Sequence, residues 1–484
     1  MQNLLSIFSP RKEVELLIYG MWPPMLLQSI PLAGPGFDVG ITEVNREFAG
    51  ALVMKRSFVS GKELLGCLDT SANVDQISQH YYNCRQNGSD RLFILIYLEW
   101  NILAFSGGAT FSDQLNRVLY PTTLVTGPLD VGLYSVMMRE LCEASNWDTI
   151  GLIFDTSSPV PFPLQIYQMF ASNEIVLSGR LQLQQFPIQA NSNLSDLLQK
   201  VSQVSRVTFL VGAPLLLRKI MIEALKQNKT FTDYAWIALE LPDQALGPVT
   251  WQRNDTYDDV ALEAFGSVKQ MILCFDRDSE ADRLLKQKII RATEESYGYS
   301  YPPGRAPSEF ATTGYLVAKM IAKVINDSVH QHLDIKNGQV LAQQFRNQTF
   351  TSGAIGGLFI DAAGKRQNKI CLSSFDRSIR KFTRVLFHDH TQNGLQVVPK
   401  AAAQLWATSD NMAPPATPFC GFLGERCREH STTIIVISTV IPAVIASVLL
   451  GFILLCHMHR HSHIHDLWWK LATQDLSIRN NRPR

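Results

Sequence analysis

The feature that most constrains this chain is an uninterrupted apolar run near its C-terminus. From Ile434 to Cys456 the sequence is IIVISTVIPAVIASVLLGFILLC, without a charged residue. A helix needs about 20 apolar residues to cross a hydrocarbon core ~30 Å thick, so this run is long enough. Pro442 is tolerable there because neighbouring groups can satisfy the freed carbonyl. We therefore expect a single-pass membrane protein with a transmembrane helix over 433–457 and a short tail over 458–484.

The flanks of this run indicate its orientation. Basic residues lie on both sides, so the positive-inside rule only leans towards a cytoplasmic C-terminus. Six N-x-[ST] tripeptides precede the run and none follows it, although some arise by chance. We expect a plasma-membrane protein with an extracellular N-terminus. Its candidate glycosylation sites are Asn87, Asn193, Asn228, Asn254, Asn326 and Asn347.

The N-terminus fits this topology poorly. The first ten residues offer only the short apolar patch LLSIF, and no small-residue cleavage site follows it. We therefore expect the start of the chain to be incomplete.

Composition excludes several classes of protein. The net charge is +1, and 18% of residues are charged while 46% are hydrophobic, which is ordinary for a globular protein with one membrane span. No basic patch indicates a nucleic-acid partner. Seven of the eight cysteines precede the apolar run, so at least one of them is unpaired or bonded between chains.

The region before the run alternates short β-branched segments with amphipathic ones. Val14–Tyr19, Thr149–Phe154 and Val207–Val211 are typical of buried strands. Helices are predicted over Phe37–Phe48, after a turn at Gly34–Gly36, and over Pro214–Gln227. This alternation predicts an α/β protein with two doubly wound, Rossmann-like lobes.

In doubly wound lobes, ligands bind beyond the carboxyl ends of the strands, here in a cleft between the lobes. Small and hydroxyl-bearing residues follow two of the predicted strands, and they are candidates for ligand contact, or else ordinary turns. They are Ser106, Gly107, Gly108 and Ala109 in the first lobe and Asp155, Thr156, Ser157 and Ser158 in the second.

The sequence contains no recognisable catalytic or metal-binding motif. The chain has no P-loop, HExxH, GxSxG or paired CxxC motif, so we expect no catalytic residues, no metal and no cofactor. The glycines of Gly34–Gly40 have the wrong spacing for a dinucleotide loop, and Pro35 removes an amide donor. The alternating histidines of 457–465 are most simply an interfacial cap on the membrane helix.

Several segments resemble the ligand-binding ectodomain of receptor guanylyl cyclases, the family that includes the natriuretic peptide receptors. The resemblance covers about residues 14–478, and the juxtamembrane segment is its most specific part, in a form typical of nematode receptor cyclases. The segments that carry it are Trp100–Ser106, Tyr120–Thr122, Trp147–Ile153, Gly353–Asp361 with Gly364–Arg366, Pro415–Cys427, and Leu467–Leu471 with Asp475–Leu476.

The resemblance implies two lobes of the type I periplasmic-binding-protein kind, an extracellular peptide or small-molecule ligand, and a dimer that signals through cyclic GMP. The first lobe is expected over 14–145, the second over 146–400 with segments returning to the first, and a stalk over 401–432. One departure is that the family's Gly-Pro-x-Cys segment before Trp100 is missing.

Two disulfides are expected. Cys420 and Cys427 flank Gly421 and Gly424, which give the short loop freedom to close, although an interchain bond is the alternative. Cys67 is expected to pair with Cys84, because a helical stretch between them brings the ends together. Cys84 would then substitute for the family's missing cysteine.

A second departure is that the sequence stops where the family's kinase-like and cyclase domains begin. The chain itself is therefore expected to be no enzyme, and to form a homodimer or a heterodimer with a full-length receptor cyclase. The alternatives are a short-tailed clearance or decoy receptor and a membrane-tethered solute-binding protein.

Overall fold

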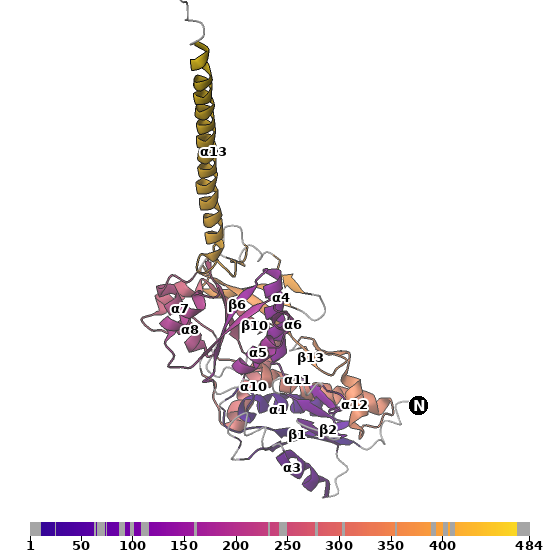
Figure 1. The fold of residues 1–484 in the computed structure, drawn as a ribbon. Helices are drawn as coiled ribbons and strands as arrows, with labels where there is room; N and C mark the ends of the chain where they lie inside the picture. The colour runs from indigo at the N-terminus through magenta and orange to yellow at the C-terminus, as the bar shows by residue number, and fades with distance from the viewer. Residues whose placement is uncertain are drawn as a thin grey trace, which may run out of the picture. The chain divides into compact units, whose positions relative to one another are not determined.

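The computed structural model describes most of the chain in two compact units, Met1–Ala416 and Thr417–Arg484 (Figure 1). The described residues are 11–24, 26–61, 64, 73, 75–86, 92–96, 101–107, 116–158, 162–230, 233–241, 249–275, 279–302, 305–353, 356–388, 394–399, 405–406 and 412–471.

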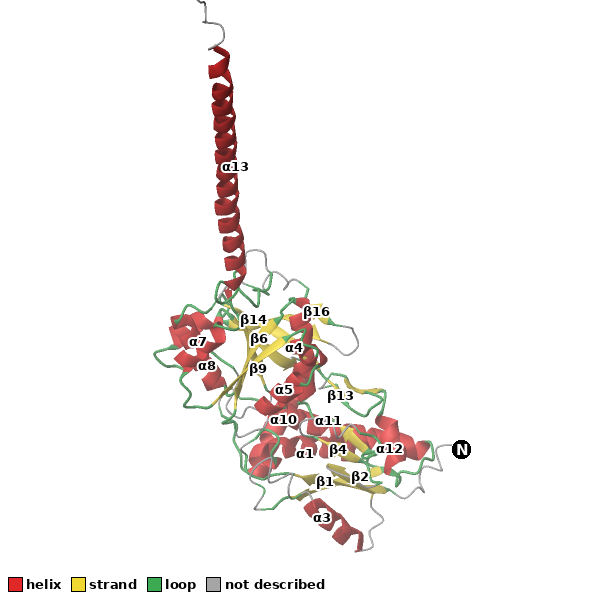
Figure 2. Ribbon diagram, in the orientation of Figure 1, coloured by secondary structure: helices red, strands yellow, loops and turns green. Residues whose placement is uncertain are grey.

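The first lobe is built on a parallel five-stranded sheet in the order β2-β1-β3-β4-β5. Side chains along β1 alternate between two cores. Leu16 and Ile18 pack with helices α1 and α11, while Leu17 and Tyr19 pack with helix α3 on the other face (Figure 2). The elements of this lobe are β1 (Lys12–Tyr19), α1 (Ile30–Glu47), β2 (Leu52–Val59), α3 (Asp75–Gln86), β3 (Leu92–Ile96), β4 (Ala104–Ser106), β5 (Thr123–Val125), α10 (Glu280–Tyr297), α11 (Glu309–His330) and α12 (Gly338–Phe345).

The second lobe is built on an eight-stranded sheet in the order β16-β15-β14-β10-β9-β8-β6-β7. Strands β6 to β10 run parallel, whereas β14, β15 and β16 are antiparallel. The same alternation sends Leu152 to a core with α4 and α5, and Ile153 to a core with α7 and α8. The elements are α4 (Val131–Ala144), β6 (Thr149–Asp155), α5 (Phe162–Ala171), α6 (Glu174–Leu177), β7 (Gln182–Ile188), α7 (Leu194–Ser202), β8 (Val207–Val211), α8 (Pro214–Lys226), β9 (Ala235–Glu240), α9 (Asp258–Phe265), β10 (Val268–Cys274), β14 (Lys369–Asp376), β15 (Lys381–His388) and β16 (Leu395–Val397).

A small antiparallel sheet joins the two lobes along the chain. It consists of β11 (Gln348–Phe350), β12 (Leu358–Ile360) and β13 (Arg366–Gln367). Leu358 and Ile360 pack into the core of the first lobe, and β14 of the second sheet follows one residue after β13. Two doubly wound lobes of mixed α/β structure are thus present, as the alternation of the sequence predicts.

The turn predicted at Gly34–Gly36 is wrong, because these residues lie inside α1. Tertiary packing explains the difference. A Cβ atom on Gly36 would lie 1.7 Å from the carbonyl oxygen of Ala311, and one on Gly40 would lie 2.8 Å from that of Tyr315. The glycines therefore allow the backbones of α1 and α11 to approach closely, and they are not turn residues.

The lobe boundary also lies earlier than residue 145. Helix α4 packs with the second sheet through Tyr134, Met138 and Leu141. Helices α10, α11 and α12 contribute residues to the core of the first lobe. The change of lobe therefore falls between β5 and α4.

The second unit contains one long helix, α13 (Glu425–Leu471). Its segment Ile434–His461 is long and apolar enough to cross a membrane, with a mean hydropathy of 2.6 over an 18-residue window. It is the one such helix among the described residues. Pro442 lies inside it. The histidines of 457–465 continue this helix, as expected.

Candidate ligand-binding site

Ser106 and Gly107 end the first-lobe strand β4 at its carboxyl end, where the sequence places them. The Ser106 side chain is buried, and its carbonyl oxygen accepts hydrogen bonds from the amides of Thr126 (2.9 Å) and Gly127 (3.1 Å). Ser106 therefore fixes the start of the connection to α4, and Gly107 is only partly exposed. Gly108 and Ala109 lie outside the described residues.

The corresponding loop of the second lobe begins at Asp155, the last residue of β6. Its buried carboxylate accepts hydrogen bonds from the amide (2.9 Å) and the hydroxyl (2.6 Å) of Ser157, which folds the loop back on itself. Thr156 donates from both its amide and its hydroxyl to the carbonyl oxygen of Ile188 (both 2.9 Å). Thr156 and Ser157 are exposed and Ser158 is partly exposed, so these three residues are available to a ligand.

An aromatic cluster lies at the carboxyl edge of the first sheet, and no local pattern in the sequence predicts it. Trp22, in the loop after β1, is 48% exposed, and its ring centroid lies 6.1 Å from that of Tyr297 and 6.4 Å from that of Phe58. Arg56 stacks 4.1 Å above Phe58 and pairs with Asp38 at 2.6 and 3.0 Å. Burial, together with the charge of Asp38, raises the pKa of Tyr297, whose hydroxyl donates to Asp38 (2.7 Å). These contacts hold an exposed tryptophan in place, which suits it for binding.

Glu240 lies at the carboxyl end of β9, in the second lobe. It is buried, and burial raises its pKa to about 7, although the carboxylate accepts hydrogen bonds from the amide of Val249 (2.9 Å) and the side chain of Gln270. The hydroxyl of Tyr134 donates to the Glu240 carbonyl oxygen at 2.6 Å. This carboxyl therefore changes protonation near neutral pH.

The chain crosses between the lobes three times, and side chains connect the three crossings. The first crossing runs from β5 to α4, the second leaves β10 at Phe275, and the third runs from β13 to β14. The buried Arg366, on the third, donates to the Thr313 hydroxyl of α11 (2.8 Å) and lies 3.5 Å from the Thr126 carbonyl of the first. Its guanidinium also lies 5.5 Å from the ring of Phe275. Arg366 thus belongs to the third crossing and contacts the other two.

A second contact joins the first and third crossings. Lys365 forms an ion pair (2.6 Å) with the buried Asp130, which caps the N-terminus of α4 through the amide of Leu133. The amide of Val125 also donates to the carbonyl of Gly364 (2.8 Å). We call Asp130, Lys365 and Arg366 the crossover cluster. Any rotation of one lobe against the other must change the contacts of these three residues.

Comparison with known proteins identifies the part of the chain that contains these features. A family model described as the receptor family ligand binding region matches residues 92–371, more than half of the chain. The chain belongs to this receptor family. The match runs from β3 through both lobes to β14, so it includes the carboxyl-edge loops of Ser106 and Asp155 and the crossover cluster.

Curated relatives of this receptor region include atrial natriuretic peptide receptor 3 from three mammals. The human protein is 22% identical over 275 residues, which cover 55% of this chain and 49% of the relative. The mouse protein is 23% identical over 240 residues, which cover 48% of this chain and 42% of the relative. The rat protein is 25% identical over 180 residues, which cover 36% of this chain and 32% of the relative. The chain therefore matches half or less of the length of these relatives.

The disulfides of this receptor chain correspond only partly to those expected. Cys420 and Cys427 are bonded, and the two glycines between them that were expected to ease closure both have positive φ. Cys274 and Cys371 form a second bond, between β10 and β14, which the sequence did not indicate. Cys142 is buried and free, in agreement with an odd cysteine. The expected pair of Cys67 and Cys84 lies outside the residues whose side chains are described.

Four of the six candidate glycosylation sites are exposed: Asn193, Asn228, Asn254 and Asn347. Asn326 lies within α11, where Ser328 of its tripeptide is buried. Asn87 lies outside the described residues. Glycosylation stays a prediction, and it is strongest for Asn193, Asn254 and Asn347, because Thr230 of the Asn228 tripeptide is also buried.

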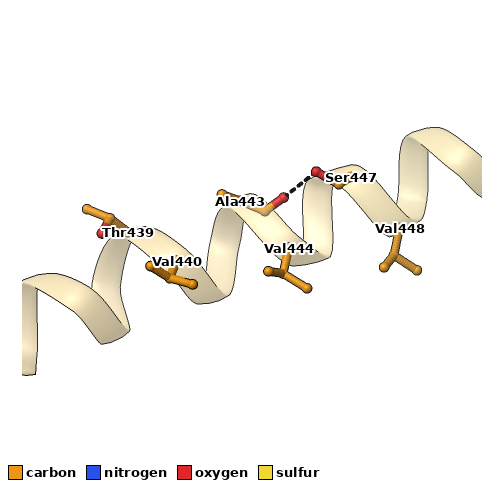
Figure 3. A pocket seen from close by; sticks show the side chains of 6 residues that line it. All are labelled: Thr439, Val440, Ala443, Val444, Ser447 and Val448. Carbon is orange, nitrogen blue, oxygen red and sulfur yellow. Dashed lines mark hydrogen bonds between the residues drawn. The ribbon is translucent and has the colours of Figure 1, made fainter.

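A shallow groove on α13 is unrelated to the candidate ligand site. It lies along the exposed surface of the apolar segment, where the Ser447 hydroxyl bonds back to the Ala443 carbonyl at 2.8 Å (Figure 3). Its lining consists of Thr439, Val440, Ala443, Val444, Ser447 and Val448. Because the hydroxyls of Thr439 and Ser447 both donate to carbonyl oxygens of the helix itself, this groove offers little recognition of a soluble ligand.

Proposed function

We propose that the chain is a cell-surface receptor that binds an extracellular ligand between the carboxyl edges of its two sheets. The observation that carries this proposal is the match of a receptor ligand-binding region to a stretch that contains strands of both sheets. Parallel α/β sheets bind ligands beyond the carboxyl ends of their strands. Helix α13 would then span the plasma membrane, with the lobes outside and the C-terminus in the cytoplasm.

The chemistry of the two edges favours a peptide ligand. At the carboxyl edge of the first sheet, Trp22 offers a large exposed ring held in place by its neighbours. At the carboxyl edge of the second sheet, Thr156 and Ser157 offer hydroxyls. A flat aromatic surface with a few hydrogen-bonding groups suits a peptide with both apolar and polar side chains. The name of the mammalian relatives also refers to a peptide.

We further propose that ligand binding changes the angle between the lobes, and that the crossover cluster sets the two preferred arrangements. A dimer of such chains would pass this change through α13. By resemblance to the receptor guanylyl cyclases, the response would be cyclic GMP formation, either by this receptor or by a full-length partner. A clearance or decoy receptor is the second candidate, in which binding leads to ligand uptake without cyclic GMP.

A binding experiment tests the site. The full chain, expressed behind a signal peptide and purified in detergent, would be screened by thermal shift against peptide and metabolite libraries, beginning with atrial natriuretic peptide. A ligand at 100 times its dissociation constant adds about 2.7 kcal/mol of stability. The variants Trp22→Ala and Ser157→Ala should then weaken binding, the first by tenfold or more, because exposed tryptophans are frequent hot spots.

Tyr82→Ala is the matched control, because Tyr82 is an equally exposed aromatic (48%) in the second half of α3, which leads towards the amino end of β3. Its affinity for the ligand should equal that of the unmodified chain. Unchanged affinity in both site variants would place the ligand elsewhere and remove the proposal. Measuring cyclic GMP in cells that co-express a full-length receptor cyclase separates the two candidate outputs.

A further inference from the structure

Two arginines contact a single turn at the amino edge of the first sheet, the edge opposite the candidate ligand site. Arg117 donates from Nη1 to the carbonyl oxygens of Tyr120 (3.2 Å) and Thr123 (2.5 Å), where the turn leads into the first residue of β5. Arg346, the residue after α12, donates from Nη2 to the carbonyl oxygen of Pro121 at 2.8 Å. The side chains therefore meet from two distant parts of the chain around residues 120–123.

Both arginines keep buried donors that have no partner. Nε and Nη2 of Arg117 and Nε of Arg346 are inaccessible to solvent and make no hydrogen bond. The hydroxyl of Thr123, a residue only 6% exposed, is unpartnered as well. Arg218, a buried arginine of the second lobe, contrasts with these, because all three of its nitrogens are bonded, to Trp251, Asp255 and Asp258. Unmet donors of charged groups are costly to bury, so their concentration at one turn calls for a partner.

Nearby charges do not supply this partner. Burial and the positive charge of Arg346 lower the pKa of Arg117, and Asp361 opposes this only from a distance. The two carboxylate oxygens of Asp361 accept hydrogen bonds from the amide of Lys365 (2.8 Å) and the side chain of Gln367. Two like charges thus remain close together in a partly desolvated place.

The backbone packs closely beside Arg117. A Cβ atom on Gly364 would lie 3.5 Å from Nη2 of Arg117 and 2.9 Å from Leu124. The backbone of the β12–β13 hairpin therefore passes close to the guanidinium, and there is no room for a large ligand.

We propose that Arg117, Arg346 and the Thr123 hydroxyl bind one small anion, either a halide or a compact oxyanion such as phosphate or a carboxylate. An anion would accept hydrogen bonds from the unpartnered N–H groups of the two arginines and from the Thr123 hydroxyl. Its negative charge would also offset the repulsion between the two guanidinium groups. It would also connect the turn before β5 to the end of α12. The site lies at the amino edge of the first sheet and is independent of the ligand proposed for the carboxyl edges.

Thermal unfolding of the full chain in detergent tests this site. Ionic strength would be held constant with gluconate, which is too bulky for the space, and replaced stepwise by chloride, bromide, phosphate or acetate. The melting temperature should rise with the logarithm of the concentration of at least one small anion, and the comparison of anions identifies the class. Arg346→Gln should weaken the apparent affinity for that anion at least tenfold, while Arg283→Gln, on the exposed face of α10, should leave it unchanged.

Isothermal titration of the unmodified chain provides a second measurement that does not depend on the folding of any variant. One anion bound per chain supports the site. No binding of any small anion would show that the donors are satisfied by water, and it would overturn the proposal. An anion effect equal in Arg346→Gln and the unmodified chain would also overturn it, because the effect would then be a general property of the salt.

Discussion

Replacing Glu240 with glutamine should change how the stability of the protein depends on pH. The carboxyl of Glu240 has a pKa of about 7 in the folded state because it is buried, against an ordinary value of 4.5. The folded state therefore holds this proton up to about pH 7, whereas the unfolded chain releases it near pH 4.5. Since the folded pKa is raised, the stability due to this group is complete below pH 4.5 and is lost as pH rises to about 7.

The difference between the two pKa values corresponds to about 3 kcal/mol of folding free energy. Glutamine cannot ionise, and its carbonyl oxygen can still accept the amide of Val249. We therefore expect the stability of Glu240→Gln, relative to the unmodified chain, to improve by up to about 3 kcal/mol between pH 4.5 and pH 8. Urea unfolding of the full chain in detergent, followed by tryptophan fluorescence at several pH values, measures this change.

Glu263→Gln serves as the control, because Glu263 is exposed on α9 of the same lobe. Its stability relative to the unmodified chain should change little with pH. A pH-independent difference for Glu240→Gln, or one that moves against the variant as pH rises, would show that Glu240 is ionised in the folded state and would refute the argument.

Two further predictions concern packing and covalent links. Gly36→Ala should cost the first lobe more than the usual overpacking penalty of about 1–3 kcal/mol, because its Cβ would lie 1.7 Å from the Ala311 carbonyl oxygen. Gly50→Ala is the control, because Gly50 has open space around it, and it should be nearly neutral in the same thermal melt. Removing the Cys274–Cys371 bond by a double serine substitution should cost about 4–5 kcal/mol, since it closes a loop with a sequence separation of 97. A melting temperature unchanged by either Gly36→Ala or the double substitution would contradict the respective prediction.

Much of the fold was predictable because the buried strands are continuous apolar runs. Val14–Tyr19, Thr149–Phe154 and Val207–Val211 all lie within strands of the two sheets. Strand β2 escaped notice because Lys55 and Arg56 interrupt its apolar pattern; it lies at the sheet edge, where such residues remain partly solvated. The sequence also predicts a strand region over Ile175–Phe186, but its first residues lie in the short helix α6 and β7 begins only at Gln182.

Long-range contacts were harder to predict than local structure. Gly34–Gly36 have the composition of a turn, and only the approach of α11 explains their place in a helix. The cluster around Trp22 joins residues from β2, α1 and α10, which no local pattern connects. The candidate loops after β4 and β6 were located from strand order alone, but burial of Ser106 and Asp155 depends on neighbouring segments. Sequence therefore located the edges, and packing decides which side chains are accessible there.

Hydrogen–deuterium exchange of the full chain, with and without a saturating ligand from the thermal-shift screen, tests the central claim most directly. We predict slower exchange in the loop of Trp22, in residues 156–158 and in the crossover segment 126–130, because ligand would bridge the two edges and fix the lobes. Segments at the amino edge of the second sheet, such as residues 145–148 before β6 and 203–206 before β8, should be unchanged. Protection confined to the amino edges of the sheets would contradict a ligand site between the carboxyl edges.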